Sequence, residues 1–415
     1  MVLSLITPGF ASAASPSGKL HQSVNETQAT AKEKVGKRLL SEFEKQEKTT
    51  FLVKFKESSD SAKVAKEARK NASKNKLSAH DAKFQQRSAV VSDLKSVSIE
   101  SQQGVVEYLE SEMASGNVDE FNSYFIVNGM AVTATKEVAE NIAAFAEVEK
   151  ILPNEERQLH ETIVKADEVA PQSELANVEW NVERVKAPET WALGIDGSGT
   201  VVASLDTGVQ WDHPALKEKY RGYDASTGTA NHQYSWFDAS TGQAVPFDDH
   251  GHGTHVTGTM VGGEPNGSNQ VGVAPGAKWI ATKVFNAAGS TTDAILLNAA
   301  QWIIAPGGDV NMAPDVVNNS WGGGPGLDEW YRDTVRAWRA AEIFPEFSAG
   351  NTTLSNPGGP GSVAVPANYP ESFATGATDI NNKVASFSLR GPSPYGEIKP
   401  DIIAPGVNIR SSVPG

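Results

Sequence analysis

The sequence predicts an α/β protein in which a large domain with a mostly parallel, helix-covered sheet follows a smaller α+β domain. Beyond residue 199, short apolar strands alternate with amphipathic helices, the order typical of a parallel sheet covered on both faces. Before residue 165 the pattern is strand, helix, two strands, helix and strand, which is the ferredoxin-like order. All nine tryptophans lie between Trp180 and Trp338, so the composition also changes between the two domains.

The smaller domain is predicted over residues 50–159. Residues 50–56 alternate in polarity as a strand with one buried face does, and the Ala- and Lys-rich stretch 59–86 favours a helix. The pair Asn128-Gly129 is a strong signal for a two-residue hairpin turn. The remaining expected elements are a helix at 102–113, strands at 123–127 and 130–134, a helix at 136–145 and a strand at 148–152.

The larger domain is predicted over residues 179–415. Its expected strands are 200–205, 278–284, 315–318 and 343–348, and its expected helices include 292–304 and 327–341. Ligands of such sheets bind at the carboxyl ends of the parallel strands. Asp206, Ser320 and Asn351 each follow the end of a predicted strand, so this edge is the expected site.

The segments outside these domains suggest export and processing. Residues 1–14 are apolar and end in Ala11-Ser12-Ala13, the small-residue pattern that a signal peptidase accepts, which predicts the remnant of a signal peptide; the alternative is a disordered apolar tail. Residues 15–49 are a predicted polar linker and residues 160–178 a predicted linker or processing region. No later stretch reaches the ~20 apolar residues of a membrane span, so we expect a secreted protein.

Composition excludes several classes of function. There is no cysteine, so the chain has neither disulfides, nor a thiol nucleophile, nor a zinc–cysteine site. The net charge of −14 is concentrated in the second part, because residues 1–165 carry 22 Lys and Arg against 23 Asp and Glu, and residues 166–415 carry 14 against 27. An acidic domain repels nucleic acids and anionic membranes, so neither is an expected partner.

Asp206 and His252 are the candidate catalytic pair. A buried carboxylate beside an imidazole fixes its tautomer and stabilises the imidazolium that forms when the ring takes a proton from a hydroxyl. Glycines on both sides of His252 allow close backbone approach and leave the ring accessible at the start of a helix. An aspartate that follows a strand also often caps a turn, so Asp206 alone is weak evidence.

A rival interpretation takes His250, His252 and His255 as metal ligands. The spacing His-x-His-x-x-His resembles the zinc signature of metallo-β-lactamase-like hydrolases, and neutral imidazoles bind zinc. That signature has an aspartate before the last histidine, where this chain has Thr254. We therefore expect His255 to be a packed or hydrogen-bonded neighbour of His252, and His250 to lie on the surface.

Five motifs in order over about residues 180–415 resemble those of the subtilisin-like serine proteases. They are Ser204–Val209, His252–Val256, Asp315–Gly323, Ser348–Asn351, and Lys399–Asp401 with Ala404–Gly406. The resemblance implies a three-layer subtilisin-like domain. Residues 50–159 resemble the inhibitor-type propeptide of this family, which assists folding of the protease and inhibits it until it is removed.

The resemblance implies a secreted serine endopeptidase made as a zymogen, with proteins and peptides as substrates and the propeptide as an intramolecular partner. A serine would attack the scissile carbonyl, His252 would transfer the proton and Asp206 would orient His252. Asn351 would donate its side-chain amide to the oxyanion. Extended substrate would pair with the backbone of Ser320, Trp321 and Gly322, and Ala364 would line the primary specificity pocket.

The nucleophile is the one catalytic residue that the resemblance does not place. The family motif is Gly-Thr-Ser-Met-Ala, and no Gly-Thr-Ser occurs in the 415 residues. Ser411 and Ser412 lie nearest, in a strand-like run at 407–413, and we interpret them as structural. We thus expect a chain cut before its nucleophile, with a C-terminally incomplete sheet domain and no activity of its own. The non-enzymatic alternative is a protease inhibitor or folding helper that acts through residues 50–159.

No cofactor is expected for the chemistry, although calcium commonly stabilises loops in the family. Residues 264–270 (EPNGSNQ) offer suitable oxygens for such a loop. Ala215 stands where an acidic ligand is usual, so the metal ligands remain unassigned.

Overall fold

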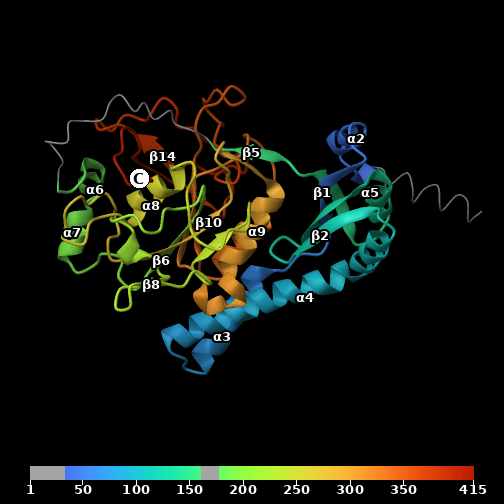
Figure 1. The fold of residues 1–415 in the computed structure, drawn as a ribbon, viewed down its shortest axis with the longest axis horizontal. Coiled ribbons are helices and arrows are strands. Elements are labelled where there is room, and N and C mark those ends of the chain that lie inside the picture. Colours follow the sequence, from blue (N-terminus) through green and yellow to red (C-terminus); the bar gives the residue numbers. More distant parts are fainter. Residues whose placement is uncertain (1–32, 160–176) are drawn as a thin grey trace, which may run out of the picture.

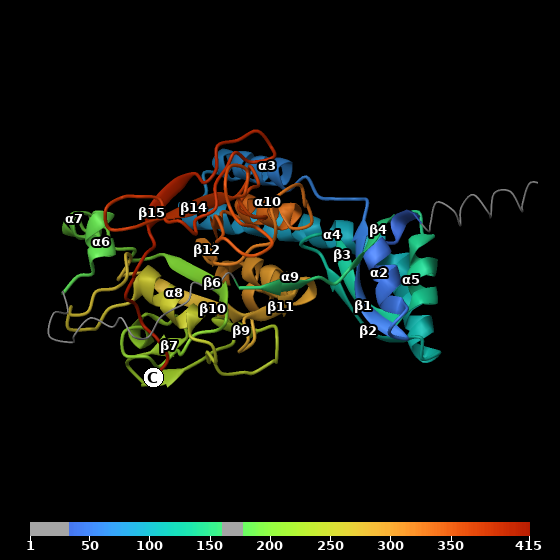
Figure 2. The same cartoon turned by 90° about the horizontal axis from the view of Figure 1, so that it is seen from above.

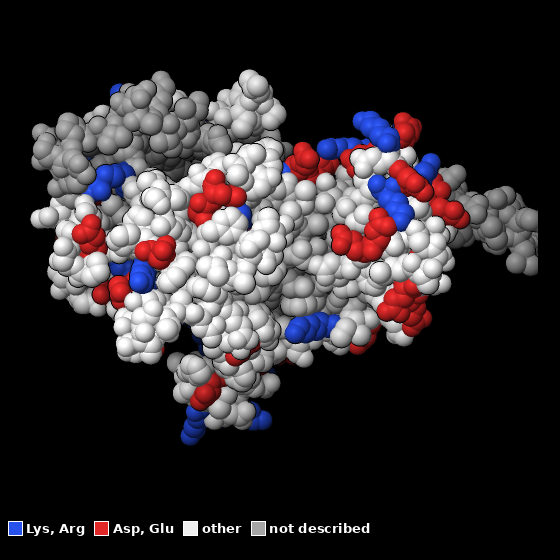
Figure 3. Space-filling view, in the orientation of Figure 1, with Lys and Arg blue, Asp and Glu red and all other residues white. Residues whose placement is uncertain are grey.

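The computed structural model describes residues 33–159 and 177–415, which form two domains lying side by side (Figure 1). The predicted signal remnant at 1–14 and nearly all of the predicted processing region lie outside these residues. On the face in Figure 3, charged side chains of both signs crowd the N-terminal domain, whereas the C-terminal domain presents broad uncharged areas. No helix in the described parts of the chain is long and apolar enough to span a membrane.

The N-terminal domain has the predicted ferredoxin-like sheet, with strand order β2-β3-β1-β4. All three pairings are antiparallel. The strands are β1 (Lys48–Phe55), β2 (Val118–Tyr124), β3 (Gly129–Thr135) and β4 (Val148–Pro153), and the helices are α2 (Lys37–Phe43), α3 (Ser61–Lys74), α4 (Ala79–Ala114) and α5 (Lys136–Ala143). The predicted polar linker at 15–49 is wrong where it overlaps α2, because Leu39 is fully buried in the core of this domain.

Three local predictions in this domain are wrong. The strand expected at 123–127 overlaps β2 at only two residues, since β2 ends at Tyr124 and residues 125–128 form a turn. The stretch 59–86 is not one helix, because Ser78 accepts a hydrogen bond from the Asp81 amide at 3.1 Å and begins a new helix, α4, which continues for 36 residues. Asn128-Gly129 is not a two-residue turn either, since Tyr124 already pairs with Gly129. Instead, Asn128 lies in a buried polar network, where its side chain accepts from Gln102 at 2.9 Å.

The C-terminal domain contains a seven-stranded sheet of order β15-β14-β13-β12-β6-β10-β9. Every pairing in this sheet is parallel. The strands are β6 (Val201–Asp206), β9 (Trp236–Asp238), β10 (Lys278–Lys283), β12 (Val316–Asn319), β13 (Phe344–Ser348), β14 (Phe373–Thr378) and β15 (Ile402–Pro405). The four strands predicted from sequence are confirmed within two residues at each end, whereas residues 407–413 do not form a strand.

Helices cover both faces of this sheet and complete the three layers. They are α8 (His252–Val261), α9 (Asp293–Ile304) and α10 (Arg332–Ala340), with α6 (Trp180–Arg184) and α7 (Ala187–Ala192) before the first strand. Successive side chains of a strand point to opposite faces. Val202 packs in a cluster with Val261 of α8, whereas Leu205 belongs to the cluster of α9 and α10. Figure 2 shows α9 toward the N-terminal domain and α8 away from it.

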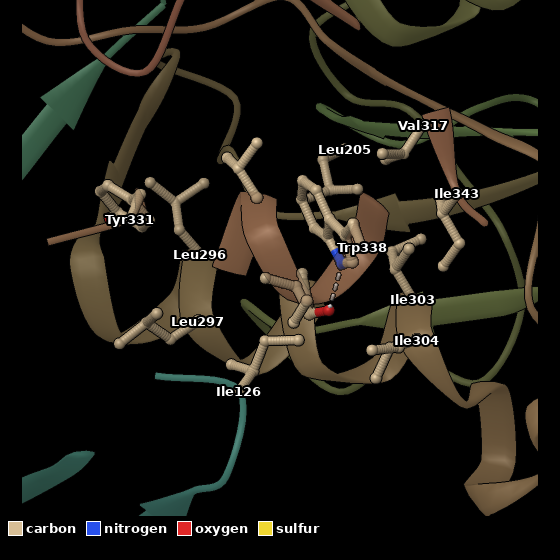
Figure 4. Close-up of a cluster of buried hydrophobic side chains, with 14 of the residues drawn as sticks. Ile126, Leu205, Leu296, Leu297, Ile303, Ile304, Val317, Tyr331, Trp338 and Ile343 are labelled. Atoms are coloured by element: carbon tan, nitrogen blue, oxygen red, sulfur yellow. Dashed lines mark hydrogen bonds between the residues drawn. The ribbon is translucent and has the colours of Figure 1, made fainter. Parts of the chain in front are cut away.

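The two domains share a hydrophobic core. Trp338 of α10 lies against α9, where its indole N–H donates to the Ala300 carbonyl at 3.1 Å (Figure 4). Ile126 of the N-terminal domain points into the same cluster and is fully buried. Burial of apolar surface across the boundary therefore holds the N-terminal domain on the α9 side of the sheet.

Candidate active site

Asp206 and His252 meet at the carboxyl edge of the sheet, as predicted. Asp206 is the last residue of β6 and His252 the first residue of α8. The His252 Nδ1 atom lies 2.6 Å from Asp206 Oδ1, and the side chains are 26% and 1% exposed, respectively. The carboxylate is thus buried behind an imidazole that remains accessible, the arrangement that orients a histidine for proton transfer.

Close backbone packing explains the glycines of the two motifs. Gly208 has a φ of 102°, and a Cβ atom there would lie 2.0 Å from the Phe247 carbonyl oxygen. A Cβ atom on Gly253 would lie 2.1 Å from the Gly208 carbonyl oxygen. The turn after Asp206 therefore contacts the first turn of α8 backbone to backbone, which sets the distance between the Asp206 and His252 side chains.

Asp248 ties these two segments together, a role that the sequence analysis missed. Its carboxylate accepts from the Thr207 hydroxyl at 2.8 Å, the Gly251 amide at 2.8 Å and the Thr254 amide at 2.9 Å. Burial raises the pKa of Asp248, but the hydrogen bonds from Thr254, Gly251 and Thr207 outweigh this and lower it. An acidic residue just before a predicted helix often accepts hydrogen bonds from the first amides of that helix, and this signal could have indicated the role of Asp248.

Replacing Asp248 by alanine should destabilise the chain by about 3 kcal/mol at pH 7, because buried donors lose their acceptor. Since folding lowers the pKa, the ionised carboxylate stabilises the fold above its unfolded-state pKa of about 4, and this contribution is lost as the pH falls through the folded-state pKa. Denaturant unfolding at pH 7 and at about pH 3 measures both effects. The control, Asp224→Ala, removes an exposed turn acceptor of Ser226; an equal loss in the two variants would contradict the role of Asp248.

Lys283, the last residue of β10, is a second buried charge beside the pair. Its Nζ atom donates to the Thr207 carbonyl at 2.7 Å, the Phe285 carbonyl at 2.8 Å and the Asp249 carboxylate at 2.6 Å. The side chain is fully buried. All three ammonium hydrogens thus have an acceptor, and the cation fixes the backbone immediately after Asp206.

The other two histidines do not join His252 as ligands of a shared metal. His255 Nε2 lies 3.0 Å from the Ile409 carbonyl oxygen, and burial lowers the pKa of His255. This agrees with its predicted role as a hydrogen-bonded neighbour. The His250 and His252 rings are 6.3 Å apart, and His250 is half-buried rather than on the surface. Within residues 33–159 and 177–415, no three His, Asp or Glu side chains are placed to hold one metal ion.

The remaining predicted site residues gather at the same edge. Strand β12 lies between β6 and β13, so Ser320 and Asn351 leave the sheet on the side of Asp206. Ala364 is buried, and its amide donates to the Ala349 carbonyl at 3.1 Å, two residues before Asn351. Trp321 is 4% exposed and packs edge-on against Tyr331 at 5.3 Å. Only the Trp321 backbone, not its indole, is therefore suited to contact a substrate.

A paired strand between the domains was not foreseen from sequence. Strand β5 (Glu156–Gln158) of the N-terminal domain pairs antiparallel with β11 (Ser290–Thr292), with Gln158 opposite Ser290. The Leu159 amide adds a hydrogen bond to the Gly289 carbonyl at 2.8 Å. The end of the N-terminal domain thus lies in an extended conformation on the C-terminal domain (Figure 1).

The loop at 264–270, where the sequence offers oxygens for calcium, is held by hydrogen bonds between its own residues. Its single carboxylate, Glu264, accepts from the Ser268 hydroxyl at 2.9 Å and the Asn269 amide at 2.7 Å. Ala215, whose carbonyl accepts from the Gly263 amide at 3.2 Å, contributes no side-chain oxygen. We therefore assign no metal ligands to this loop.

A buried aspartate in contact with an accessible histidine, at the carboxyl edge of a parallel sheet, is an arrangement that serine peptidases share. The profile of the Subtilase family matches residues 197–414, and that of the peptidase inhibitor I9 domain matches residues 50–160. The chain belongs to the subtilase family of serine endopeptidases and carries an I9-type N-terminal domain.

Curated relatives agree with this membership. The chain is 58% identical to bacillopeptidase F of Bacillus subtilis (strain 168) over its whole length, which covers 30% of that protein. It is 34% identical to subtilisin Savinase of Lederbergia lenta, over 58% of this chain and 76% of that protein. It is 31% identical to subtilisin E of Bacillus subtilis (strain 168), over 66% of this chain and 64% of that protein. The chain thus spans less than a third of the length of bacillopeptidase F.

Proposed function

We propose that the chain is the precursor part of a secreted subtilisin-like endopeptidase that hydrolyses peptide bonds in proteins through an acyl-enzyme. The observation that carries this proposal is the 2.6 Å contact between His252 Nδ1 and the buried Asp206 carboxylate. Family membership gives the reaction class, and the accessible ring gives the proton-transfer group.

In the proposed mechanism, a serine oxygen bonds to the scissile carbonyl carbon while His252 takes the hydroxyl proton. The tetrahedral adduct collapses as the amine leaves with that proton, which forms the acyl-enzyme. A water oxygen then bonds to the acyl carbon while His252 takes a proton from the water. The acid is released as the bond to the serine oxygen breaks and His252 returns the proton to that oxygen. Asp206 holds the ring through Nδ1 and stabilises its cationic form, and the Asn351 side-chain amide donates to the oxyanion. Ser320 to Gly322 present backbone groups to extended substrate, and Ala364 lines the primary pocket.

Ser411 and Ser412 are poor candidates for the nucleophile. The Ser411 hydroxyl donates to the His255 carbonyl at 2.7 Å, and the Ser412 hydroxyl donates to the Thr254 carbonyl at 2.9 Å. Both therefore support α8 rather than face a substrate. No Gly-Thr-Ser occurs in the 415 residues, so we assign no residue of this sequence as the nucleophile.

Hydrolysis of a peptide p-nitroanilide by the full-length encoded protein tests this function, together with labelling by a fluorophosphonate. We expect hydrolysis and labelling of the full-length protein, and no labelling of the 415-residue chain alone. If the full-length protein shows neither hydrolysis nor labelling after its N-terminal domain is removed, the proposal is wrong. A label on Ser411 or Ser412, located by mass spectrometry, would overturn their structural assignment.

We also propose that the N-terminal domain acts as an intramolecular inhibitor and folding partner, which is the second candidate function. Arg87 of α4 favours it, because this 5% exposed side chain reaches into the C-terminal domain. Its guanidinium donates to the carbonyls of Ala341, Ala313 and Pro314 at 2.9, 3.0 and 2.7 Å. These carbonyls lie at the end of α10 and just before β12, so one side chain fastens the domain to two elements of the sheet layer.

Replacing Arg87 by alanine should destabilise the docked state by about 3 kcal/mol, because three buried carbonyls lose their donors. Hydrogen exchange on the 415-residue chain should show faster exchange in α3 and the first half of α4. The matched control is Arg69→Ala, which removes an arginine of α3 that is 59% exposed. Unchanged exchange in the Arg87 variant would argue against this anchor.

A further inference from the structure

The side chain of Arg157 is bound inside the C-terminal domain. This residue is the centre of β5, and its guanidinium makes two parallel hydrogen bonds with the Asp293 carboxylate, Nε to Oδ1 at 2.7 Å and Nη2 to Oδ2 at 3.0 Å. The Asp293 side chain is 4% exposed and that of Arg157 is 18% exposed. A two-pronged contact of this kind is specific for a guanidinium, because an ammonium lacks the planar pair of donors.

The pocket around this guanidinium belongs to the C-terminal domain. The Tyr331 hydroxyl donates to Asp293 Oδ1 at 2.5 Å, and Asp328 lies 3.8 Å from Nη2. A Cβ atom at Gly323 would lie 3.0 Å from Nη1, so glycine leaves room for the arginine. Burial lowers the pKa of Arg157, but the bonds and charge of Asp293 outweigh it and raise the pKa. Burial and the Asp293 charge raise the pKa of Tyr331, which keeps its hydroxyl as a donor.

The segment that carries Arg157 runs toward the catalytic pair. The Phe285 amide donates to the Asp206 carbonyl at 3.2 Å, so the connection from β10 to β11 starts beside the catalytic aspartate. Leu159 pairs with Gly289 at the end of this connection, and Arg157 pairs with Thr291 of β11, in antiparallel order. The chain therefore approaches Asp206 from residue 157 to residue 159. A substrate bound in the same way would place the side chain that corresponds to Arg157 on the N-terminal side of its scissile peptide bond, which would lie beside His252.

We propose that Asp293, Tyr331 and Asp328 form an arginine-selective subsite, which binds an arginine of peptide substrates a few residues before the scissile bond. This inference rests on the proposed peptidase function. A lysine would satisfy one oxygen of Asp293 rather than two. An apolar side chain would leave the buried carboxylate without its cation, and a site of this kind rejects ligands that lack the matching group. Arg157 occupies the subsite from within the chain.

Peptide binding to a variant of the 415-residue chain tests the subsite. The double substitution Arg157→Gly with Leu159→Gly vacates the pocket and weakens the pairing of β5. The probes are fluorescein-labelled peptides with the sequence of residues 156–159, carrying arginine, lysine or the neutral isostere citrulline at the second position. Fluorescence polarisation should give a dissociation constant about tenfold or more lower for the arginine peptide than for the citrulline peptide. Adding Asp293→Asn should bring the dissociation constants of the arginine and citrulline peptides within about twofold of each other. Adding Asp333→Asn, which removes a nearby charge outside the pocket, should leave the difference between them unchanged.

Equal affinities for arginine and citrulline would overturn the inference, as would a preference that survives Asp293→Asn. Failure of every peptide to bind at about 1 mM would also overturn it and leave Arg157 as an anchor within the chain. Binding requires no nucleophile, so the result is independent of the hydrolysis test. Hydrolysis by the full-length protein with equal kcat/KM for arginine and citrulline substrates would reject the subsite and keep the peptidase. Selective binding of the arginine peptide by the 415-residue variant, with no hydrolysis by the full-length protein, would keep the subsite and reject the peptidase function.

Discussion

Replacing His252 by alanine is expected to lower kcat for peptide hydrolysis by the full-length protein by about 10⁶-fold. In subtilisin, a member of the same family, loss of the catalytic histidine costs about this factor, because the serine is not activated and the leaving amine is not protonated. The geometry that predicts the same loss here is the 2.6 Å contact from Nδ1 to Asp206, which orients the ring for proton transfer.

His250→Ala provides a matched control for this experiment. The His250 and His252 rings lie 6.3 Å apart. The control therefore removes an imidazole two residues before His252 without removing either partner of the contact between His252 and Asp206. We expect the control to retain hydrolysis within about tenfold. Comparable losses in both variants would instead favour the metal-ligand interpretation, in which the histidines act as a set. Melting temperatures of the two 415-residue variants show whether folding contributes to either loss.

The parts of the fold that sequence could predict are those with strong local signals. Strand β6 is a β-branched apolar run that ends at Asp206, and both features are visible in the residues themselves. The glycines around His252 indicated close backbone approach, which the contact of Gly253 with Gly208 explains. Spacing and order of the motifs then placed Asp206, His252 and Asn351 on one edge of the sheet.

Features that depend on distant pairings could not be predicted from sequence. Strand β5 is three polar residues and β11 is another three, so neither shows apolar alternation, and their pairing joins residues more than 130 positions apart. The same reason hid the Arg157–Asp293 contact. The predicted two-residue turn at Asn128-Gly129 is wrong for a related reason, since a buried hydrogen-bond network with Gln102 overrides the local turn preference.

Charged side chains that are removed from solvent are the second kind of feature that could not be predicted from sequence. Lys283 and Asp248 are residue types that usually lie on the surface, but Lys283 is fully buried and Asp248 is half-buried, and each depends on several partners from other segments. Both act on the same short stretch, since Lys283 binds the Thr207 carbonyl and Asp248 binds the Thr207 hydroxyl. The backbone after Asp206 is therefore held by two charges of opposite sign, which helps to keep Asp206 at a fixed distance from His252.

The substitution Asp206→Asn is expected to lower kcat of the full-length protein by about 10⁴-fold while leaving the fold intact. Removal of the triad aspartate costs about 3 × 10⁴-fold in subtilisin, and the asparagine variant of a serine protease leaves geometry unchanged but favours the wrong histidine tautomer. In this chain one oxygen, Asp206 Oδ1, lies 2.8 Å from the Thr207 amide and 2.6 Å from His252 Nδ1, so an asparagine oxygen in its place keeps both contacts and the variant loses the negative charge that stabilises the imidazolium. The loss should therefore lie in catalysis rather than in packing.

Steady-state kinetics on the full-length protein and unfolding of the 415-residue chain separate these two effects. We expect KM to change by less than about threefold and the free energy of unfolding by less than about 1 kcal/mol, because the substitution keeps the volume of a side chain that is 1% exposed. Asp212→Asn, an exposed carboxylate six residues later, should keep full kcat. A loss below about tenfold in the Asp206 variant would mean that His252 is oriented by another group, and the Asp206–His252 pair would lose its catalytic role.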